Sequence, residues 1–272
     1  MKSKLAIITV NFENYEQTFE FISYFQSQSD TNFHLFISDL SDRKIKIEKK
    51  EFLDVILGQN KGYSHGVNLG IKKALDMGYT QFAVINNDTR VAPSFTHIVS
   101  SAIEKNPLTL IGGKIYYEKG FEYHADRYKD SQLGRVLWYA GGGVNWAHAT
   151  PYHRGVDEVD QGQYDNIELT DFITGCLMCF DKDVIDTVGF WDVRYFLYFE
   201  DADYCERAKK NKIPLIYDPS ITIWHKNAQS TGGPGSTLHQ KYQRKNKVRF
   251  GLKYAPLRTK MHLLKNLLSG HL

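Results

Sequence analysis

The first hundred residues alternate between short apolar runs and longer segments with helical spacing. In the longer segments apolar residues recur every three or four positions, as on the buried face of a helix. This alternation predicts an α/β chain with a mostly parallel, Rossmann-like central sheet and helices on both faces. The predicted strands are 5–10, 33–38, 52–57 and 82–85, and the predicted helices are 15–28, 64–76 and 93–105.

The second half of the chain has a less regular pattern. A glycine-rich stretch lies between Trp138 and Trp146, and apolar runs predict further strands at 171–180 and 221–224. Residues 226–237 have the composition of a flexible loop, which we expect to order over a bound ligand.

Small polar or acidic residues follow all four predicted strands of the first half. Ligands of parallel sheets bind beyond the C-terminal strand ends, so these side chains are expected to gather at one crevice. Turn formation by Asn, Asp and Gly explains one or two such ends, but four less readily. Neither a G-x-G-x-x-G fingerprint nor a P-loop is present. The residues are Asn11, Asp39, Asn60, Gly62, Asn86, Asn87 and Asp88.

Residues 196–203 read Phe-Leu-Tyr-Phe-Glu-Asp-Ala-Asp, so three carboxylates follow directly after an aromatic run. Carboxylates are costly to bury, so a cluster of them against an aromatic wall indicates a purpose. Removal of a proton from an alcohol is one such purpose. Capping of a helix that begins here is the alternative, and both interpretations are compatible. The three residues are Glu200, Asp201 and Asp203.

Charge is distributed unevenly along the chain. The formal net charge is +3, yet ten Lys or Arg and no Asp or Glu occur from Pro219 to Leu272, and the rest holds 24 basic and 31 acidic residues. A basic end on an acidic body points to an anionic partner, such as a membrane surface, a pyrophosphate or a nucleic acid. We divide the chain into a domain over 1–238, with halves 1–110 and 111–238, and a basic helical appendage at 239–272.

The cysteines and the lengths of the apolar runs narrow the cellular setting. Three cysteines argue against a disulfide framework and for a reducing compartment. No run reaches the 18 or so apolar residues of a membrane span. The first apolar stretch fits a core strand better than a signal peptide. We therefore expect a cytoplasmic protein.

Several of these segments, taken in order, are typical of one enzyme family. The chain resembles the family 2 inverting glycosyltransferases of the GT-A type, and within them the bacterial branch that contains rhamnosyltransferases. The resemblance covers residues 5 to about 250. The segments that carry it are Thr9–Asn11, Asn60–Gly62, Asn68–Gly70, Ile85–Asp88, Gly141–Gly143, Phe172–Cys176, Tyr198–Asp203 and Trp224–His225.

The resemblance implies a site for a nucleoside diphosphate sugar and a divalent metal. Asp88 stands in the family's DxD-like motif, and with His225 it is expected to hold Mn²⁺ or Mg²⁺. A core or loop histidine is the alternative for His225. The residues implied to bind the nucleotide are Val10, Asn11, Asp39, Asn60, Gly62, Asn87 and Asp88.

The resemblance also implies a general base. Asp201 matches it, and the like charge of neighbouring Glu200 is expected to raise the pKa of Asp201. Trp138 is expected to stack on a sugar, with plain core packing as the alternative. The residues implied to contact the sugar or acceptor are Trp138, Gly142, Gly143, Gly175 and Asp203.

The implied reaction is metal-assisted transfer of a sugar, with inversion, onto a glycan or lipid-linked glycan in cell-surface polysaccharide synthesis. Rhamnose from dTDP-rhamnose is the favoured donor; the alternatives are a UDP-hexose donor or an inactive nucleotide-sugar or glycan-binding module. A sugar nucleotidyltransferase would need a glycine- and lysine-rich loop after the first strand, which is absent. For 239–272 we weigh peripheral contact with the anionic inner face of the cell membrane, packing on the domain, and a homodimer contact. We expect no nucleic acid partner.

Overall fold

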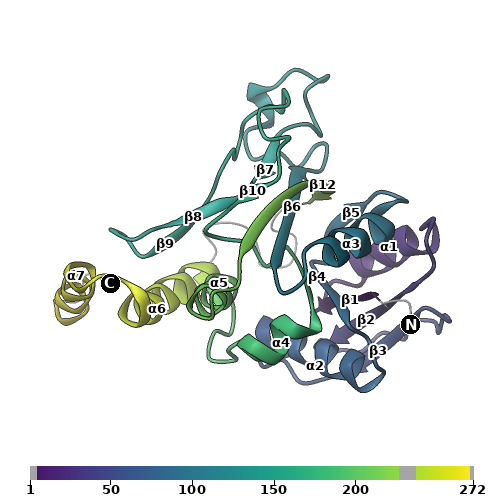
Figure 1. Ribbon diagram of the computed structural model, residues 1–272, viewed down its shortest axis with the longest axis horizontal. Helices are drawn as coiled ribbons and strands as arrows, with labels where there is room; N and C mark the ends of the chain where they lie inside the picture. Colours follow the sequence, from purple (N-terminus) through teal and green to yellow (C-terminus); the bar gives the residue numbers. More distant parts are fainter. Residues whose placement is uncertain (1–4, 227–236, 270–272) are drawn as a thin grey trace.

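The computed structural model describes residues 5–226 and 237–269, so most of the predicted 226–237 loop lies outside the described residues. The elements form a ten-stranded mixed sheet with helices packed on it and a separate two-stranded hairpin. Helices α1 and α3 lie on one side of the parallel strands, and α2 and α4 lie on the other (Figure 1). The α/β fold with a mostly parallel sheet and helices on both faces is thus confirmed.

The N-terminal half is a regular strand-and-helix unit. Its parallel strands run in the order β4-β1-β2-β3. All five residues of β4 are buried, because neighbouring strands and the covering layers enclose it, and this explains its continuous apolar run. The elements are β1 (Leu5–Asn11), α1 (Tyr15–Gln26), β2 (Phe33–Asp39), β3 (Leu53–Leu57), α2 (Tyr63–Asp76) and β4 (Gln81–Ile85), within two residues of the predicted bounds.

The second half extends the same sheet past β4. Strand β11 (Leu177–Asp181) is antiparallel to β4, and β6 (Leu110–Tyr117) and β12 (Leu215–His225) continue beyond it as a parallel pair. The small elements at this end are β5 (Thr89–Val91), the 3₁₀ turn Ala125–Arg127, β7 (Leu137–Tyr139) and β10 (Glu168–Leu169); β8 (Gly142–Asn145) and β9 (Thr150–His153) form the hairpin.

Two strand predictions in this half need correction. Only the end of the predicted strand 171–180 is a strand, because side chains bind its first half instead of a neighbouring strand. The phenol of Tyr139 donates to the carbonyl of Phe172, at 2.7 Å, and the Ile173 N–H donates to the Cys205 thiol. Conversely, 221–224 is only the last part of the longer β12.

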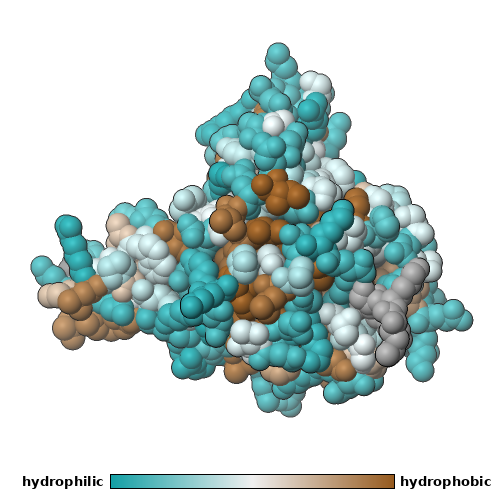
Figure 2. All heavy atoms as spheres, viewed as in Figure 1, coloured by the Kyte–Doolittle hydropathy of each residue, from teal (hydrophilic) through white to brown (hydrophobic). Residues whose placement is uncertain are grey.

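The remaining helices are α3 (Phe95–Lys105), α4 (Lys182–Val188), α5 (Glu200–Lys210), α6 (Thr237–Tyr254) and α7 (Leu257–Leu268). The helical tail breaks into α6 and α7 at Pro256, which has no N–H to continue the first helix. Among the described residues, no helix combines the length and hydropathy that a membrane span requires. In the view of Figure 2 hydrophilic residues surround two groups of apolar residues, one in the middle of the molecule and one at its left end, over α7.

Candidate active site

A cavity of about 640 Å³ opens at the C-terminal ends of β1 and β4. Its walls come from distant segments: these strand ends, the turn before α5, the end of β12 and one face of α6. The topology explains the position, because polar residues that follow parallel strands meet at one edge of the sheet. The predicted site residues that line it are Val10, Asn60, Gly62, Asn87, Asp88, Trp138, Gly175, Glu200, Asp201 and His225.

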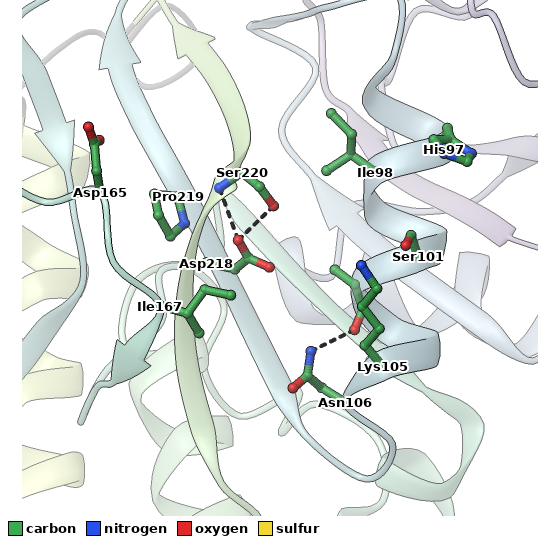
Figure 3. A pocket seen from close by; sticks show the side chains of 11 residues that line it. His97, Ile98, Ser101, Lys105, Asn106, Asp165, Ile167, Asp218, Pro219 and Ser220 are labelled. Carbon is green, nitrogen blue, oxygen red and sulfur yellow. Dashed lines mark hydrogen bonds between the residues drawn. The ribbon is translucent and has the colours of Figure 1, made fainter. Parts of the chain in front are cut away.

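A second hollow lies between α3 and the middle of β12 (Figure 3). Several of its polar groups are already bonded within the protein. Oδ1 of Asp218 accepts from the N–H and hydroxyl of Ser220, and the Asn106 amide donates to the carbonyl of Ala102. None of the predicted site residues is among the described residues that line it. The candidate chemistry therefore belongs to the first cavity.

Asp201 is held by backbone N–H groups from two directions. Its Oδ2 accepts from the Gly175 N–H at 2.9 Å, and its Oδ1 accepts from the Ala202 N–H at 2.8 Å. Each oxygen keeps a further lone pair for a ligand. Neighbouring Glu200 is 6% exposed, and its Oε2 has no hydrogen-bond partner among the described atoms. One carboxyl of the pair is therefore oriented by hydrogen bonds, and the other is buried with one of its oxygens unpartnered among the described atoms.

The two carboxyl groups differ in their tendency to ionise. Burial, followed by the charge of Asp201, raises the pKa of Glu200 well above its usual value. Burial also raises the pKa of Asp201, but the N–H bonds from Gly175 and Ala202 oppose that shift. Both shifts favour the protonated form, whereas the N–H donors of Gly175 and Ala202 favour the carboxylate form of Asp201. The pKa of Asp201 is raised, as expected, but the main cause is burial rather than the charge of Glu200.

The turn that leads into this pair is strained. Tyr198 and Phe199 have φ angles of +68° and +70°, in the left-handed region that large side chains rarely adopt. Each such residue costs on the order of 1–3 kcal/mol and persists only where its surroundings hold it. The strain sets the direction in which α5 begins, with Glu200 and Asp201 in its first turn.

Helix α6 holds this turn. The buried amide of Asn246 donates to the carbonyls of Leu197 and Tyr198, at 2.9 and 3.0 Å. The Phe250 ring packs against Phe199, with 5.6 Å between ring centroids. Part of the segment that we expected to be an appendage thus packs on the body of the protein, beside the candidate base.

The second acidic group of the cavity is Asp88, opposite the end of β12. Asp88 and His225 are each 4% exposed, and Asp88 Oδ1 lies 3.2 Å from His225 Nε2. The chain brings them together because β12 pairs with β5, and the Lys226 N–H donates to the carbonyl of Asp88 at 2.9 Å. The Trp138 ring meets His225 edge to face, with centroids 4.5 Å apart.

The pair has the donor atoms of a partial metal site. Apart from their mutual contact, neither Asp88 Oδ1 nor His225 Nδ1 has a hydrogen-bond partner among the atoms that the structure describes. Among the described residues, no three His, Cys, Asp or Glu side chains converge as a ready-made metal centre. A carboxylate oxygen and an imidazole nitrogen nevertheless suit Mn²⁺ or Mg²⁺, with further positions left for oxygens of a ligand.

The charge of His225 depends on its neighbours. Burial lowers the pKa of His225, but the nearby Cys176 and Asp88 outweigh burial and leave that pKa well above its usual value. Burial raises the pKa of the Cys176 thiol. The His225 ring faces the Asp88 carboxyl, with 3.2 Å between Nε2 and Oδ1.

Asn11 and Asp39 lie behind the cavity wall rather than on it. They are 0% and 1% exposed, and the Asn11 amide donates to Asp39 Oδ1 at 3.1 Å. The other oxygen of Asp39 accepts from the Tyr15 hydroxyl at 2.8 Å. Their side chains thus form an internal network, whereas their neighbours Val10 and Leu40 face the cavity.

Gly62 is needed for a close backbone approach. Its φ is +98°, and a Cβ at this position would lie 2.3 Å from the carbonyl oxygen of Phe196. The side chain of Asn60 accepts from the Gly62 N–H, and the Tyr63 N–H donates to the same Phe196 carbonyl, at 2.8 Å. The start of α2 is thereby fixed to the turn before α5.

The predicted sugar contacts are only partly brought together. Gly142 and Gly143 lie in the hairpin strand β8, where added Cβ atoms would meet Tyr152 at 2.4 and 2.8 Å. These glycines serve hairpin packing and do not line the cavity. Asp203 is 0% exposed and also lies away from the cavity. It binds Arg207, Lys253 and Tyr254 at 2.9, 2.7 and 2.8 Å.

Several cavity residues were missed from the sequence. Tyr63 donates to the Asn86 side chain, at 2.9 Å, and Tyr242 and Gln243 of α6 line the cavity. Tyr63 directly follows the Asn60–Gly62 segment, so proximity in sequence was an available signal. No local pattern marks Asn246 or the α6 residues, because their role depends on where that helix packs.

The chain was compared with known proteins. No protein-family model matches it. It is 21% identical over 159 residues to a low-salt glycan biosynthesis hexosyltransferase of Haloferax volcanii, covering 58% of this chain and 46% of that protein. It is 23% identical over 188 residues to a dTDP-rhamnosyl transferase of Shigella flexneri, covering 68% and 55%.

A shorter match is 35% identical over 68 residues, to an N-acetylglucosaminyl-diphospho-decaprenol L-rhamnosyltransferase of Mycobacterium tuberculosis. It covers 25% of this chain and 22% of that protein. The chain spans about half the length of the first two relatives.

Among solved structures, the fold matches that of GalNAc-T7 with UDP, GalNAc and Mn²⁺. The TM-score is 0.65 at 12% identity, over 90% of this chain and 48% of that one. The similarity shows that the expected fold type is present. The chain thus has a GT-A fold, and the curated proteins to which it is related are glycosyltransferases.

Proposed function

We propose that the protein transfers a sugar from a nucleoside diphosphate donor to a glycan or lipid-linked acceptor, with inversion at the anomeric carbon. One observation carries the proposal. Asp201, oriented by backbone N–H groups, shares a cavity with Glu200 and with the Asp88–His225 pair. An inverting displacement needs both a base for the acceptor and a group that neutralises a departing diphosphate.

In the proposed reaction Asp201 takes the proton of an acceptor hydroxyl while the oxygen of that hydroxyl bonds to the anomeric carbon. The bond from that carbon to the diphosphate breaks, and the electron pair leaves with the diphosphate. The N–H groups of Gly175 and Ala202 hold the carboxylate in position throughout. Asp88 and His225 would hold the divalent ion, which when bound supplies charge neutralisation to the leaving group.

The proposed donor is dTDP-rhamnose. Two of the related proteins are named as rhamnosyl transferases, one of them with a dTDP-linked donor. A UDP-hexose is the second candidate, favoured by the related hexosyltransferase and by the UDP in the GalNAc-T7 structure. The acceptor class rests on the mycobacterial relative, whose name gives a decaprenol diphosphate.

The donor is tested by thermal stabilisation and hydrolysis with dTDP-, UDP- and GDP-sugars, each with and without Mn²⁺. We expect dTDP-rhamnose to raise the melting temperature when Mn²⁺ is present. Stabilisation by UDP-hexoses alone would select the second donor. No response to any nucleotide sugar would contradict a donor site in this cavity.

The base is tested with Asp201→Asn. Transfer should fall about 10²- to 10⁴-fold, because the amide cannot accept the proton, while donor stabilisation persists. Asp183→Asn, in the exposed first turn of α4, is the matched control and should leave transfer unchanged. Wild-type transfer by Asp201→Asn would exclude the assigned base. Donor binding without transfer by the wild type would instead indicate a binding module.

A further inference from the structure

Helix α7 carries a row of exposed apolar side chains. The residues are spaced at i, i+4, i+7 and i+11, which places them on one face of the helix. Figure 2 shows apolar residues at this end of the molecule. We define the α7 stripe as Leu257, Met261, Leu264 and Leu268, which are 73%, 63%, 45% and 89% exposed.

The opposite face of α7 is already packed. The Thr259 hydroxyl donates to the carbonyl of Trp146, at 2.8 Å. Leu263 is 3% exposed and packs with Ala149 and Ala255. The α7 stripe therefore cannot fold back onto the domain without breaking an existing interface, and it faces outward on a supported helix.

The stripe is bordered by positive charge. On a helix of 100° per residue, Arg258 and Lys265 lie on one side of it and Lys260 on the other. From 237 to 269 the chain has no acidic residue. Apolar side chains flanked by cations are typical of helices that lie in the surface of an anionic bilayer, where basic side chains reach the headgroups.

We propose that α7 docks on an anionic lipid surface, with the α7 stripe inserted among the lipids and its basic residues at the phosphates. The proposed lipid contact involves α7 alone, whereas the sequence indicated the whole segment 239–272. In α6 the buried Asn246 and Phe250 face the protein instead, so that helix serves the cavity.

A second copy of the chain fits this surface less well. A two-fold contact would pair the stripe with itself. It would also bring Arg258, Lys260 and Lys265 near their own counterparts, with no acidic residue in α6 or α7 to offset them. Anionic headgroups supply that missing negative charge.

The position of α7 gives the contact a use. The helix packs on the turn of the β8–β9 hairpin, and Thr150 and Pro151 of that hairpin line the cavity. Lipid-bound α7 would keep the cavity near a membrane where a lipid-linked acceptor is embedded. This purpose rests on the proposed function, but the binding itself does not depend on it.

The test is co-sedimentation of the whole chain with vesicles of phosphatidylglycerol and phosphatidylcholine, compared with phosphatidylcholine alone. No sugar or metal is added. We expect at least about tenfold tighter binding to the anionic vesicles, weakened by salt. Equal binding to both vesicle types, or binding to neither, would overturn the proposal.

The variant Met261→Glu/Leu264→Glu should weaken anionic-vesicle binding at least about tenfold, with an unchanged melting temperature because both positions are exposed. Leu169→Glu, on the edge strand β10 and 76% exposed, is the matched control and should bind like the wild type. Unchanged binding by the α7 variant would refute lipid insertion. Light scattering provides a second check. If the wild type is a dimer and the variant is a monomer that still binds vesicles, the stripe is a dimer contact and the lipid proposal is refuted.

The lipid proposal and the proposed function fail separately. Vesicle binding without transfer from any donor would leave the lipid contact standing and count against the transferase. Transfer to a soluble acceptor without vesicle binding would do the reverse.

Discussion

The two acidic sites of the cavity are built in opposite ways. Asp201 has both carboxylate oxygens bound by backbone N–H groups, at 2.9 and 2.8 Å, and sits behind a strained turn. Within the described residues, Oδ1 of Asp88 contacts His225 but accepts no other hydrogen bond, and Nδ1 of His225 has no partner. The first arrangement suits the base of the proposed reaction, whereas the second leaves donor atoms for the cation of the proposed metal site. Two aspartates therefore differ in chemistry because their neighbours leave different hydrogen-bonding groups without a partner.

The largest expected effect separates the two sites by their binding behaviour. Asp88→Asn should abolish the Mn²⁺-dependent part of donor stabilisation and lower transfer about 100-fold or more, because a charged oxygen ligand is lost. Asp201→Asn should retain that stabilisation. Thermal melts with donor, with and without Mn²⁺, provide the measurement. Equal stabilisation in both variants would contradict the division of roles.

The next prediction concerns the clamp on the strained turn. Asn246→Leu should lower kcat about 10- to 100-fold with little change in the donor KM, because the carbonyls of Leu197 and Tyr198 lose their donor and Asp201 shifts. Lys247→Gln, one residue along α6, is the control. Asn246→Ser keeps one donor and should restore part of kcat. A loss of stability without any change in kcat would show a merely structural role.

A further prediction concerns the stability contribution of the glycine that joins α2 to this turn. Gly62→Ala should destabilise the fold by about 3 kcal/mol, because its Cβ would clash with the Phe196 carbonyl. Gly78→Ala also places alanine at positive φ but in open space, so about 1–2 kcal/mol is expected. Denaturant melts of both variants isolate the clash. Equal losses would mean that the close approach relaxes freely.

The smallest expected effect is a pH dependence of stability. The folded-state pKa of Glu200 lies above its unfolded value, so the native state binds more protons between the two values. Stability should therefore fall as pH rises through the folded-state pKa of Glu200. Glu200→Gln removes this proton uptake and should flatten the decline. Melting temperatures from pH 5 to 9 measure it, and parallel curves for both proteins would contradict a buried, protonated Glu200.

Much of the N-terminal half could be predicted from sequence because its signals are local. Buried parallel strands require continuous apolar runs, and their ends require polar residues or glycine, so β1 to β4 and the crevice follow directly. Asn11 and Asp39 show the limit of this reasoning. Both follow the expected strands, yet mutual hydrogen bonds turn their side chains away from the cavity.

The structure of the second half could not be predicted in the same way, because it depends on contacts between distant segments. The cluster at 200–203 indicated buried carboxylates, but the periodicity alone did not separate Asp201, beside Gly175, from Asp203, beside Lys253. These two residues lie on different sides of one helical turn. Which side faces a cavity depends on where α5 and α6 pack.

The sequence by itself determined the order of strands and helices, the polar strand ends and the motif series that resembles glycosyltransferases, because each rests on neighbouring residues. Only the tertiary structure decided which carboxylate is oriented, that Asp88 meets His225, and that α6 lines the cavity while α7 turns an apolar face outward. Those features need segments at least 26 residues apart, such as Gly175 with Asp201 or Leu197 with Asn246, to meet at hydrogen-bonding distance. Burial and charge act on a residue only through such neighbours.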